Sequence, residues 1–420
     1  MSRRHPHPMQ IQSQQTGFSL RPRRIALALG TVEVISWGVS FYLPAIVAGP
    51  AAVSLHVSKI GILGGFSWAL LAAGLLAPRV GRKIDRVGGR LVVAASTLII
   101  AVGLALLAAA PNLLFWYAGW TVLGAGMSTG LYDAAFATVG HLFGAGSAPA
   151  ITGITLIAGF ASTIFWPLGA ALLPALGWRG LLFFYAGLEL AVNLPLVLLF
   201  VPADGAVPAA DDDLKVASSD AAGGTEGGRA KALGCLSAFF TLRWFITSAI
   251  AVFVLRLFAG IGLSRGEAVF VAALFGPSQV AGRVLDYALS ERLGLLVRAR
   301  LGAALMPAGI LILALHGPPI AFAVCYGISN GILTINRGTL PMAIFGPEGY
   351  ATLLGWLAMP VLLAQAGAPT LVAPVVAAIA PRDVFILAGV VGGAAAFLLL
   401  PLKLGPGLPR PQRSKEAHSR

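Results

Sequence analysis

Two short segments of this 420-residue chain are near copies of each other, and each lies between long apolar stretches. The first is Gly81-Arg82-Lys83-Ile84-Asp85, and the second, Gly282-Arg283-Val284-Leu285-Asp286, begins 201 residues later. An offset of nearly half the chain indicates an internal duplication in which each half carries the same number of spans. The pair therefore predicts two structural halves of equal size.

The composition places both halves in a membrane. Apolar residues make up 57% of the chain and charged residues 11%, and the mean hydropathy is +0.86. A soluble globule of this size could not bury so much apolar surface, so lipid must solvate it. The apolar runs are continuous and do not alternate with period two, which excludes a membrane β-barrel. We predict an all-α membrane protein.

Apolar segments of sufficient length, some extended by flanking residues, predict twelve transmembrane helices in two six-helix bundles. In the first half they are Ile25–Ala48, Ile60–Leu76, Leu91–Ala110, Leu113–Val139, Ile151–Leu176 and Leu181–Val201. In the second half they are Cys235–Leu257, Ala268–Ala281, Leu301–Leu315, Ile320–Ile335, Tyr350–Ala378 and Val384–Leu402. The predicted domains are a tail (1–24), a bundle (25–201), a linker (202–232), a second bundle (233–402) and a tail (403–420).

Arginine and lysine residues gather on one side of this predicted topology. The net charge of +13 is concentrated in the tails and in every second connection, where we count Arg283 and Arg337 among the inner positive charges. This asymmetry predicts a multi-pass protein of the cell inner membrane with both termini in the cytoplasm. It also argues against nucleic acid as the partner. The linker, rich in Ala, Gly, Ser and Asp, is expected to be a flexible cytoplasmic spacer.

The segment Gly81-Arg82-Lys83-Ile84-Asp85-Arg86-Val87-Gly88-Gly89-Arg90 lies between the second and third predicted spans. It resembles the motif of the major facilitator superfamily, which reads Gly, three residues, Asp-Arg, one residue, Gly and a following basic residue. The resemblance implies two six-helix bundles and a conformational latch at their cytoplasmic ends. Carried over, the latch residues are Gly81, Asp85, Arg86, Gly88 and Arg90, with Gly282, Arg283 and Asp286 from the degenerate copy.

Two positions depart from patterns found in this family. Members that use an arginine on the fourth span carry it four residues before a glycine, where this chain has Trp120 before Gly124. On the fifth span, Trp166 stands where antiporter-type members have a glycine before the proline. The resemblance therefore supplies neither a coupling arginine on the fourth span nor a signature of export.

Three acidic residues fall inside predicted spans: Glu33, Asp133 and Glu189. An ionisable side chain in the bilayer is costly unless it is paired or faces a cavity, so each is a functional hypothesis. In the resembled fold the first and fourth spans line the central cavity, which favours Glu33 and Asp133 as proton-coupling residues. Glu189 is a weaker candidate, because it could pair with Asn193. A structural hydrogen-bonding role is the alternative for all three.

Six further residues are candidates for binding the solute: Trp37, Tyr42, Tyr132, Arg256, Gln279 and Asn330. Rings with a few polar anchors are typical of small-molecule sites, and a guanidinium can bind a carboxylate in a forked geometry. The alternatives are packing of the rings and, for Arg256, extension of its charged end to the outer membrane interface.

The sequence contains no phosphate-binding Gly-x-x-x-x-Gly-Lys-Ser/Thr loop, no Ser/His/Asp arrangement and no metal-ligand cluster. The two cysteines, Cys235 and Cys325, are expected to be packing residues. We therefore predict no enzyme, no cofactor and no metal, and we expect the lipid bilayer, a small molecule and protons as partners.

These residues predict a secondary active transporter that moves a small organic solute or toxicant by alternating access, driven by the proton gradient. Efflux is favoured only because exporters are common in the resembled family. Uptake of a small carboxylate or vitamin, an uncoupled facilitator, and a non-transporting sensor or scaffold are the alternatives.

Overall fold

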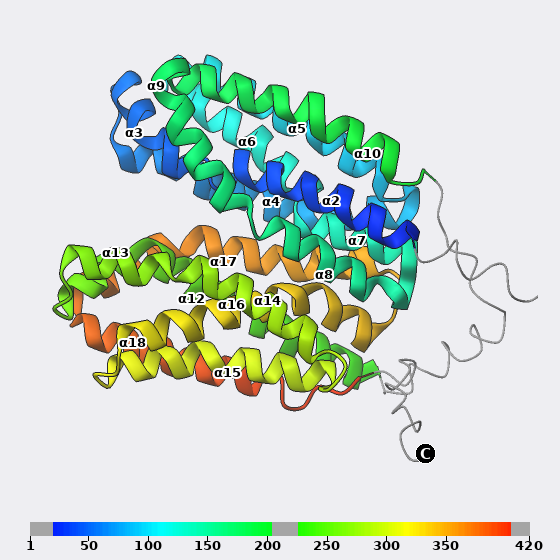
Figure 1. Ribbon diagram of the computed structural model, residues 1–420, viewed down its shortest axis with the longest axis vertical. Coiled ribbons are helices and arrows are strands. Elements are labelled where there is room, and N and C mark those ends of the chain that lie inside the picture. Colours follow the sequence, from blue (N-terminus) through cyan, green and yellow to red (C-terminus); the bar gives the residue numbers. More distant parts are fainter. Residues whose placement is uncertain (1–19, 204–225, 405–420) are drawn as a thin grey trace, which may run out of the picture.

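A computed structural model describes residues 20–203 and 226–404, and every regular element in these ranges is a helix. The helices form two bundles that lie side by side (Figure 1). The N-terminal bundle contains α2 (Leu20–Val39), α3 (Pro44–Ser54), α4 (Lys59–Val87), α5 (Gly89–Ala109), α6 (Leu113–Gly130), α7 (Tyr132–Phe143), η1 (Gly144–Ser147), α8 (Ala148–Ala158), α9 (Ala161–Leu188), η2 (Glu189–Asn193) and α10 (Leu194–Phe200). The C-terminal bundle contains α12 (Glu226–Gly260), α13 (Arg265–Ala273), α14 (Phe275–Leu289), α15 (Leu295–Ala314), α16 (Pro319–Phe345), α17 (Tyr350–Ala378) and α18 (Pro381–Phe397).

This architecture confirms the all-α membrane class. Nine segments of the described chain are long and apolar enough to cross a membrane, and one of them, Leu113–Phe200, runs through several helices. The number of twelve crossings stays a prediction. The predicted tails and linker fall largely outside the described residues, although residues 226–232 belong to helix α12 and not to a flexible spacer.

Four predicted spans are broken into two helices. The breaks separate α2 from α3, α6 from α7 at Leu131, α8 from α9, and α13 from α14 at Leu274. At the first break Pro44 opens α3, and proline cannot donate the backbone hydrogen bond that would continue α2. At the second break Leu131 is extended, with a ψ of −176°. Broken helices in transporters expose backbone groups where solutes and ions bind.

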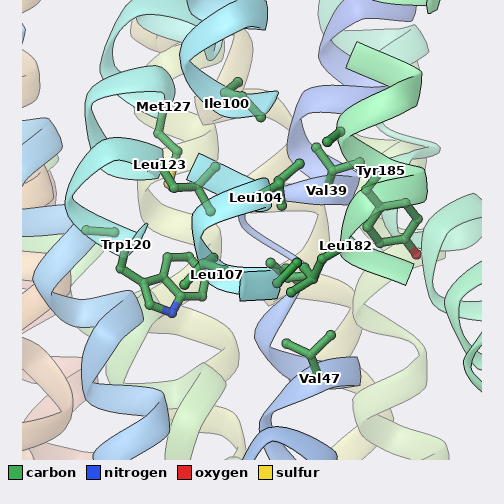
Figure 2. Packing of buried hydrophobic residues seen from close by; sticks show 14 of the residues in the cluster. Val39, Val47, Ile100, Leu104, Leu107, Trp120, Leu123, Met127, Leu182 and Tyr185 are labelled. Carbon is green, nitrogen blue, oxygen red and sulfur yellow. The ribbon is translucent and has the colours of Figure 1, made fainter. Parts of the chain in front are cut away.

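Apolar side chains hold the N-terminal bundle together. Figure 2 shows part of this core, in which Val39 and Val47 belong to one cluster with residues of α5, α6 and α9. Trp120, which stands where a coupling arginine was sought, is only 1% exposed and belongs to this core. Helices α5 and α6 approach closely because Gly103 lies against the backbone of Leu123.

The two bundles touch through α4, α7, α8 and η1 on one side and α14, α16 and α17 on the other. The tightest contact joins α4 to α17. A Cβ atom added to Gly81 would lie 2.2 Å from the Ala351 carbonyl oxygen, and one added to Gly355 would lie 2.3 Å from the Ala77 carbonyl oxygen. Only glycine permits this approach, which closes the end of the molecule that we predict to be cytoplasmic.

Several helices are longer than the predicted spans, and in three of them the added residues carry the charges that matter here. Helix α4 continues to Val87, α14 to Leu289 and α16 to Phe345, beyond the predicted ends at Leu76, Ala281 and Ile335. Asp85, Arg283 and Arg337 therefore lie on helices, and the expectation that they occupy cytoplasmic loops was wrong. A span predicted from apolar residues ends near the first charged residue. These helices continue further because their charged side chains form hydrogen bonds with groups of neighbouring helices.

Candidate functional site

Besides the Asp286–Arg298 pair within the C-terminal bundle, six ionisable side chains lie buried or half-buried in the interior. The N-terminal bundle contributes the carboxylates of Glu33, Asp133 and Glu189, and the C-terminal bundle contributes the guanidinium groups of Arg243, Arg283 and Arg337. Among the described residues, two surface hollows lie elsewhere, one lined by Arg229 and Phe345 and the other by Glu267 and Phe270. Glu33, Glu189, Arg243 and Arg283 are buried, whereas Asp133 and Arg337 are half-buried.

Glu33 lies on α2 and has no exposed surface. The indole N–H of Trp37, one helical turn further on, donates to Glu33 Oε2 at 2.7 Å. Glu33 Oε1 is buried and has no hydrogen-bond partner. One oxygen of this carboxyl group is therefore held in place, while the other is available to a proton.

Trp37 is also the centre of an aromatic cluster. Its ring centroid lies 4.9 Å from that of Tyr132 and 4.8 Å from that of Phe41. Tyr42 adds an edge-to-face contact with Trp166 at 5.7 Å. The break between α6 and α7 places Tyr132 at the start of α7, facing α2. The predicted residues Trp37, Tyr42 and Tyr132 are thus brought together, next to Glu33.

Asp133 forms an ion pair across the bundle boundary. Arg337 Nη2 on α16 donates to Asp133 Oδ2 at 2.6 Å, with exposed side-chain fractions of 13% for Arg337 and 23% for Asp133. Asp133 lies in the first turn of α7, where the helix dipole favours an anion. Its Oδ1 atom is buried without a partner, and Arg337 also stacks over Trp244 with its Cζ atom 5.7 Å from the ring centroid.

Arg283 crosses the same boundary from α14. It is 4% exposed, and its Nη1 donates to the Thr155 carbonyl oxygen on α8 at 2.7 Å. The guanidinium lies close to the phenol groups of Tyr42 and Tyr132, and its Nε atom has no acceptor. Within residues 20–203 and 226–404, no carboxylate pairs with Arg283.

Arg243, on α12, is buried in the C-terminal bundle with 2% of its surface exposed. Its Nη2 donates to Asn330 Oδ1 at 2.5 Å and to Ser329 Oγ at 3.3 Å, and its Nη1 donates to the Thr247 hydroxyl. All of these partners are neutral. The predicted residue Asn330 therefore holds this guanidinium in place in the present conformation.

Glu189 lies at the π-helical turn η2. This turn packs against α2, α5, α9 and α10, all of which belong to the N-terminal bundle. The Ser36 hydroxyl donates to Glu189 Oε1 and the Asn193 amide donates to Glu189 Oε2, each at 2.9 Å. The expected pairing with Asn193 is present.

The two remaining solute-binding candidates are Arg256 and Gln279. Arg256 is exposed, and at 100° per residue it lies roughly 220° around α12 from Arg243, on the opposite face. The interpretation that its charged end extends to the membrane interface fits this position better than solute binding. Gln279 is half-buried, and its backbone carbonyl packs against Gly331, where an added Cβ would lie 2.2 Å away.

The latch candidates separate into two groups. Asp85 accepts hydrogen bonds from the Ala351 and Thr352 backbone N–H groups at 3.2 and 2.8 Å and from the Thr352 hydroxyl at 2.6 Å, all at the N-terminus of α17. Its partner is thus a helix end of the other bundle and not a neighbouring arginine. Arg90 donates to the Leu198 carbonyl oxygen at 2.6 Å, and Arg86 is exposed.

Gly88 of the motif, and Gly282 and Asp286 of the second copy, make their contacts within their own bundle. Gly88 joins α4 to α5 with a φ of +77°, which glycine adopts readily. In the second copy, Gly282 packs against the Ile328 carbonyl oxygen, and Asp286 pairs with Arg298 inside the C-terminal bundle. Of this copy, only Arg283 forms a hydrogen bond with the other bundle.

Sequence reasoning left out Arg243, and it placed Arg337 and the latch candidate Arg283 among the inner positive charges of the connections. Arg243 falls inside the predicted seventh span, so the rule applied to buried acids would have singled it out. For Arg337, the apolar run that resumes at Leu340 signals a longer span. For Arg283, the sequence contains no comparable signal, because its burial depends on contact with the other bundle.

Comparison with known proteins agrees with this arrangement. The chain is 27% identical over 361 residues to the gentisate transporter of Corynebacterium glutamicum, covering 81% of this chain and 79% of that protein. Its fold matches the human organic anion transporter MFSD10 with a TM-score of 0.67 at 17% identity, covering 90% and 99% of the two chains. It also matches the proton:xylose symporter XylE with a TM-score of 0.68 at 14% identity, covering 91% and 96%. Residues 26–359 match the sequence profile of the Major Facilitator Superfamily; together with the two-bundle fold, this match establishes that the chain belongs to that family of membrane transporters.

Proposed function

We propose that this protein takes up a small aromatic carboxylate together with protons, by alternating access across the cell inner membrane. The observation that carries the proposal is the pair of buried guanidinium groups, Arg243 and Arg283, that lack a carboxylate partner among the described residues. An unneutralised charge in the membrane interior is unfavourable, so an anionic solute is the expected counterion.

The aromatic cluster supports the choice of an aromatic anion. Arg283 lies beside Tyr42 and Tyr132, and Trp37 packs on Tyr132. A solute with a carboxylate and a ring could bind Arg283 in a forked geometry and stack on these side chains. Gentisate, named in the relative from Corynebacterium glutamicum, is such an aromatic carboxylate, and MFSD10 carries organic anions.

Glu33 and Asp133 supply a route for coupling. Protonation of Asp133 would remove its attraction for Arg337 and weaken a contact that holds the two bundles together. Glu33 has one carboxyl oxygen free to take up a proton next to the aromatic cluster. Binding of protons and solute from outside, opening of the cytoplasmic end and release inside then form one cycle, in which Asp85 and the N-terminus of α17 act as the latch.

The test uses right-side-out membrane vesicles with an acidic exterior and labelled gentisate. We expect accumulation above the outside concentration and solute-dependent proton entry. Arg283→Gln should raise the KM at least tenfold, because one charged hydrogen-bonded contact is worth about 1.5–3 kcal/mol. Arg256→Gln, the same substitution at an exposed arginine of α12, is the control and should leave transport unchanged.

Three results would count against the proposal. Equal flux of gentisate and of an uncharged ring analogue would exclude anion recognition. Equal flux with and without the proton gradient, unaltered by Glu33→Gln, would leave a facilitator. Net movement of solute outward against its gradient would indicate efflux.

A further inference from the structure

Arg243 carries a positive charge that no acidic side chain described for the C-terminal bundle neutralises. Its side chain is 2% exposed, and a guanidinium group stays protonated in proteins. Among the described side chains of this bundle, the one buried carboxylate is that of Asp286, which pairs with Arg298. The other described acidic residues of the bundle are exposed: Glu267, Glu291, Glu348 and Asp383. A buried positive charge without a negative partner is unfavourable, so a counterion from solution is expected.

A solute with one carboxylate can neutralise only one of the two unpaired guanidinium groups. Arg283 reaches across the bundle boundary, because its Nη1 donates to the Thr155 carbonyl oxygen of α8. The hydrogen bonds of Arg243 instead end within its own bundle, on α12 and α16. The solute that we place at Arg283, next to the aromatic cluster of the N-terminal bundle, therefore leaves the charge of Arg243 in need of a separate anion.

Two of the three groups that hold the Arg243 guanidinium are themselves held in place. Thr247 and Ser329 accept from Nη1 and Nη2, and their hydroxyl groups donate to the carbonyl oxygens of Arg243 and Gly302 at 3.0 and 2.6 Å. The third group is Asn330, whose Oδ1 atom lies 2.5 Å from Nη2. The guanidinium is thus fixed at a crossing of α12, α15 and α16 by neutral oxygen atoms alone.

The guanidinium also has an unused donor. Arg243 Nε is buried without an acceptor, and Nε and Nη2 are neighbours in the planar guanidinium group, with N–H bonds that form one fork. An anion placed between these two nitrogens would supply the missing acceptor and would compete with only one hydrogen bond of Nη2. The amide group of Asn330 can rotate to make room, whereas the two hydroxyl groups are tied to backbone carbonyls.

We propose that Arg243 binds a chloride ion between Nε and Nη2. A monoatomic anion suits a guanidinium that is almost completely buried and surrounded by hydrogen-bond partners, because it needs less space than a carboxylate and accepts from several donors without a preferred geometry. Its single charge matches that of Arg243. With chloride bound, Arg283 is left as the guanidinium that attracts the solute. The binding of chloride stands apart from the proposed function, and only this last consequence rests on it.

Thermal unfolding of the purified full-length protein tests the site without any solute. Replacing gluconate by chloride at constant ionic strength should raise the unfolding midpoint by several degrees, because a ligand that binds the folded state stabilises it. In Arg243→Gln the dissociation constant of chloride should rise at least tenfold, a factor that corresponds to about 1.4 kcal/mol. Arg256→Gln, the same change at an exposed arginine of α12, should retain the full response to chloride.

A pair of substitutions at Asn330 keeps the test informative if Arg243→Gln fails to fold. Asn330→Asp places a carboxylate where the amide oxygen lies 2.5 Å from Arg243 Nη2, so the protein then contains its own counterion and the response to chloride should be lost. Asn330→Ser, a change without a charge at the same position, should retain that response. In crystals grown with bromide, the wild type should show an anomalous peak beside Arg243 Nε that is missing in Asn330→Asp.

Three results would overturn the proposal. The first is a wild-type unfolding midpoint that is equal in chloride and gluconate. The second is a response to chloride that persists in both Arg243→Gln and Asn330→Asp, which would place the ion elsewhere. The third is displacement of chloride by gentisate, which would assign Arg243 to the solute and leave the proposed function intact. If the wild type does not move gentisate, the proposed function fails, and the response to chloride still decides the role of Arg243.

Discussion

The contact between α4 and α17 offers the sharpest test of how the two bundles close at the end that we predict to be cytoplasmic. Gly81→Ala adds a Cβ atom 2.2 Å from the Ala351 carbonyl oxygen, whereas ordinary contact begins at 3.4 Å. The separation must therefore grow by about 1.2 Å, and since the obstacle is backbone, no side-chain rotation can relieve it. Overpacking of this kind costs about 1–3 kcal/mol, and here it acts only on the closed state.

The expected result is a shift of the closed-to-open equilibrium toward opening by a factor of about 5–150. Spin labels at the exposed positions Lys83 and Glu348, introduced after replacing Cys235 and Cys325 by serine, report the distance between the two bundles at this end. Gly81→Ala should increase the population at long distance.

Two further variants calibrate this measurement. Gly74→Ala should have a smaller effect, because its Cβ would lie 3.2 Å from the nearest atoms of α17. Gly187→Ala, in open space, is the control for the same chemical change and should leave the distances as in the wild type. If Gly81→Ala retains the wild-type distribution, the closed interface is not held as tightly as we infer.

Three other predictions concern charged groups. Asp133→Asn removes the ion pair with Arg337 and should favour opening by about 1–2 kcal/mol, a modest value because both groups are partly exposed; an unchanged label distance would contradict it. Asp286→Asn breaks a pair inside one bundle and should lower the free energy of unfolding by about 3 kcal/mol in denaturant titrations without moving the labels. Gly159→Ala places a Cβ atom 2.2 Å from Arg283 Nη1, which is the movable end of a side chain. The free energy of unfolding should therefore change by less than about 1 kcal/mol, while the affinity for gentisate falls several-fold. An unchanged affinity would place the solute away from Arg283.

Much of the fold could be predicted from the sequence because its determinants are local. Long continuous apolar runs require lipid and satisfy their backbone only as helices. The segment Gly81 to Asp85 and its copy indicated two halves, and Glu33, Asp133 and Glu189 stood out because acids are rare in such runs. Trp37 and Tyr132 were candidates on different grounds, because rings with a few polar anchors are typical of small-molecule sites.

The tertiary structure alone decided which charges meet. Asp133 and Arg337 are 204 residues apart in sequence, and Ser36 and Glu189 are 153 residues apart. Such pairs depend on how each helix is rotated about its axis and where it breaks, as α6 does before Tyr132, and no local pattern specifies either. For the same reason Arg283, which a count of inner positive charges assigns to the membrane surface, proved to be buried against the other bundle, whereas Arg256 remains exposed.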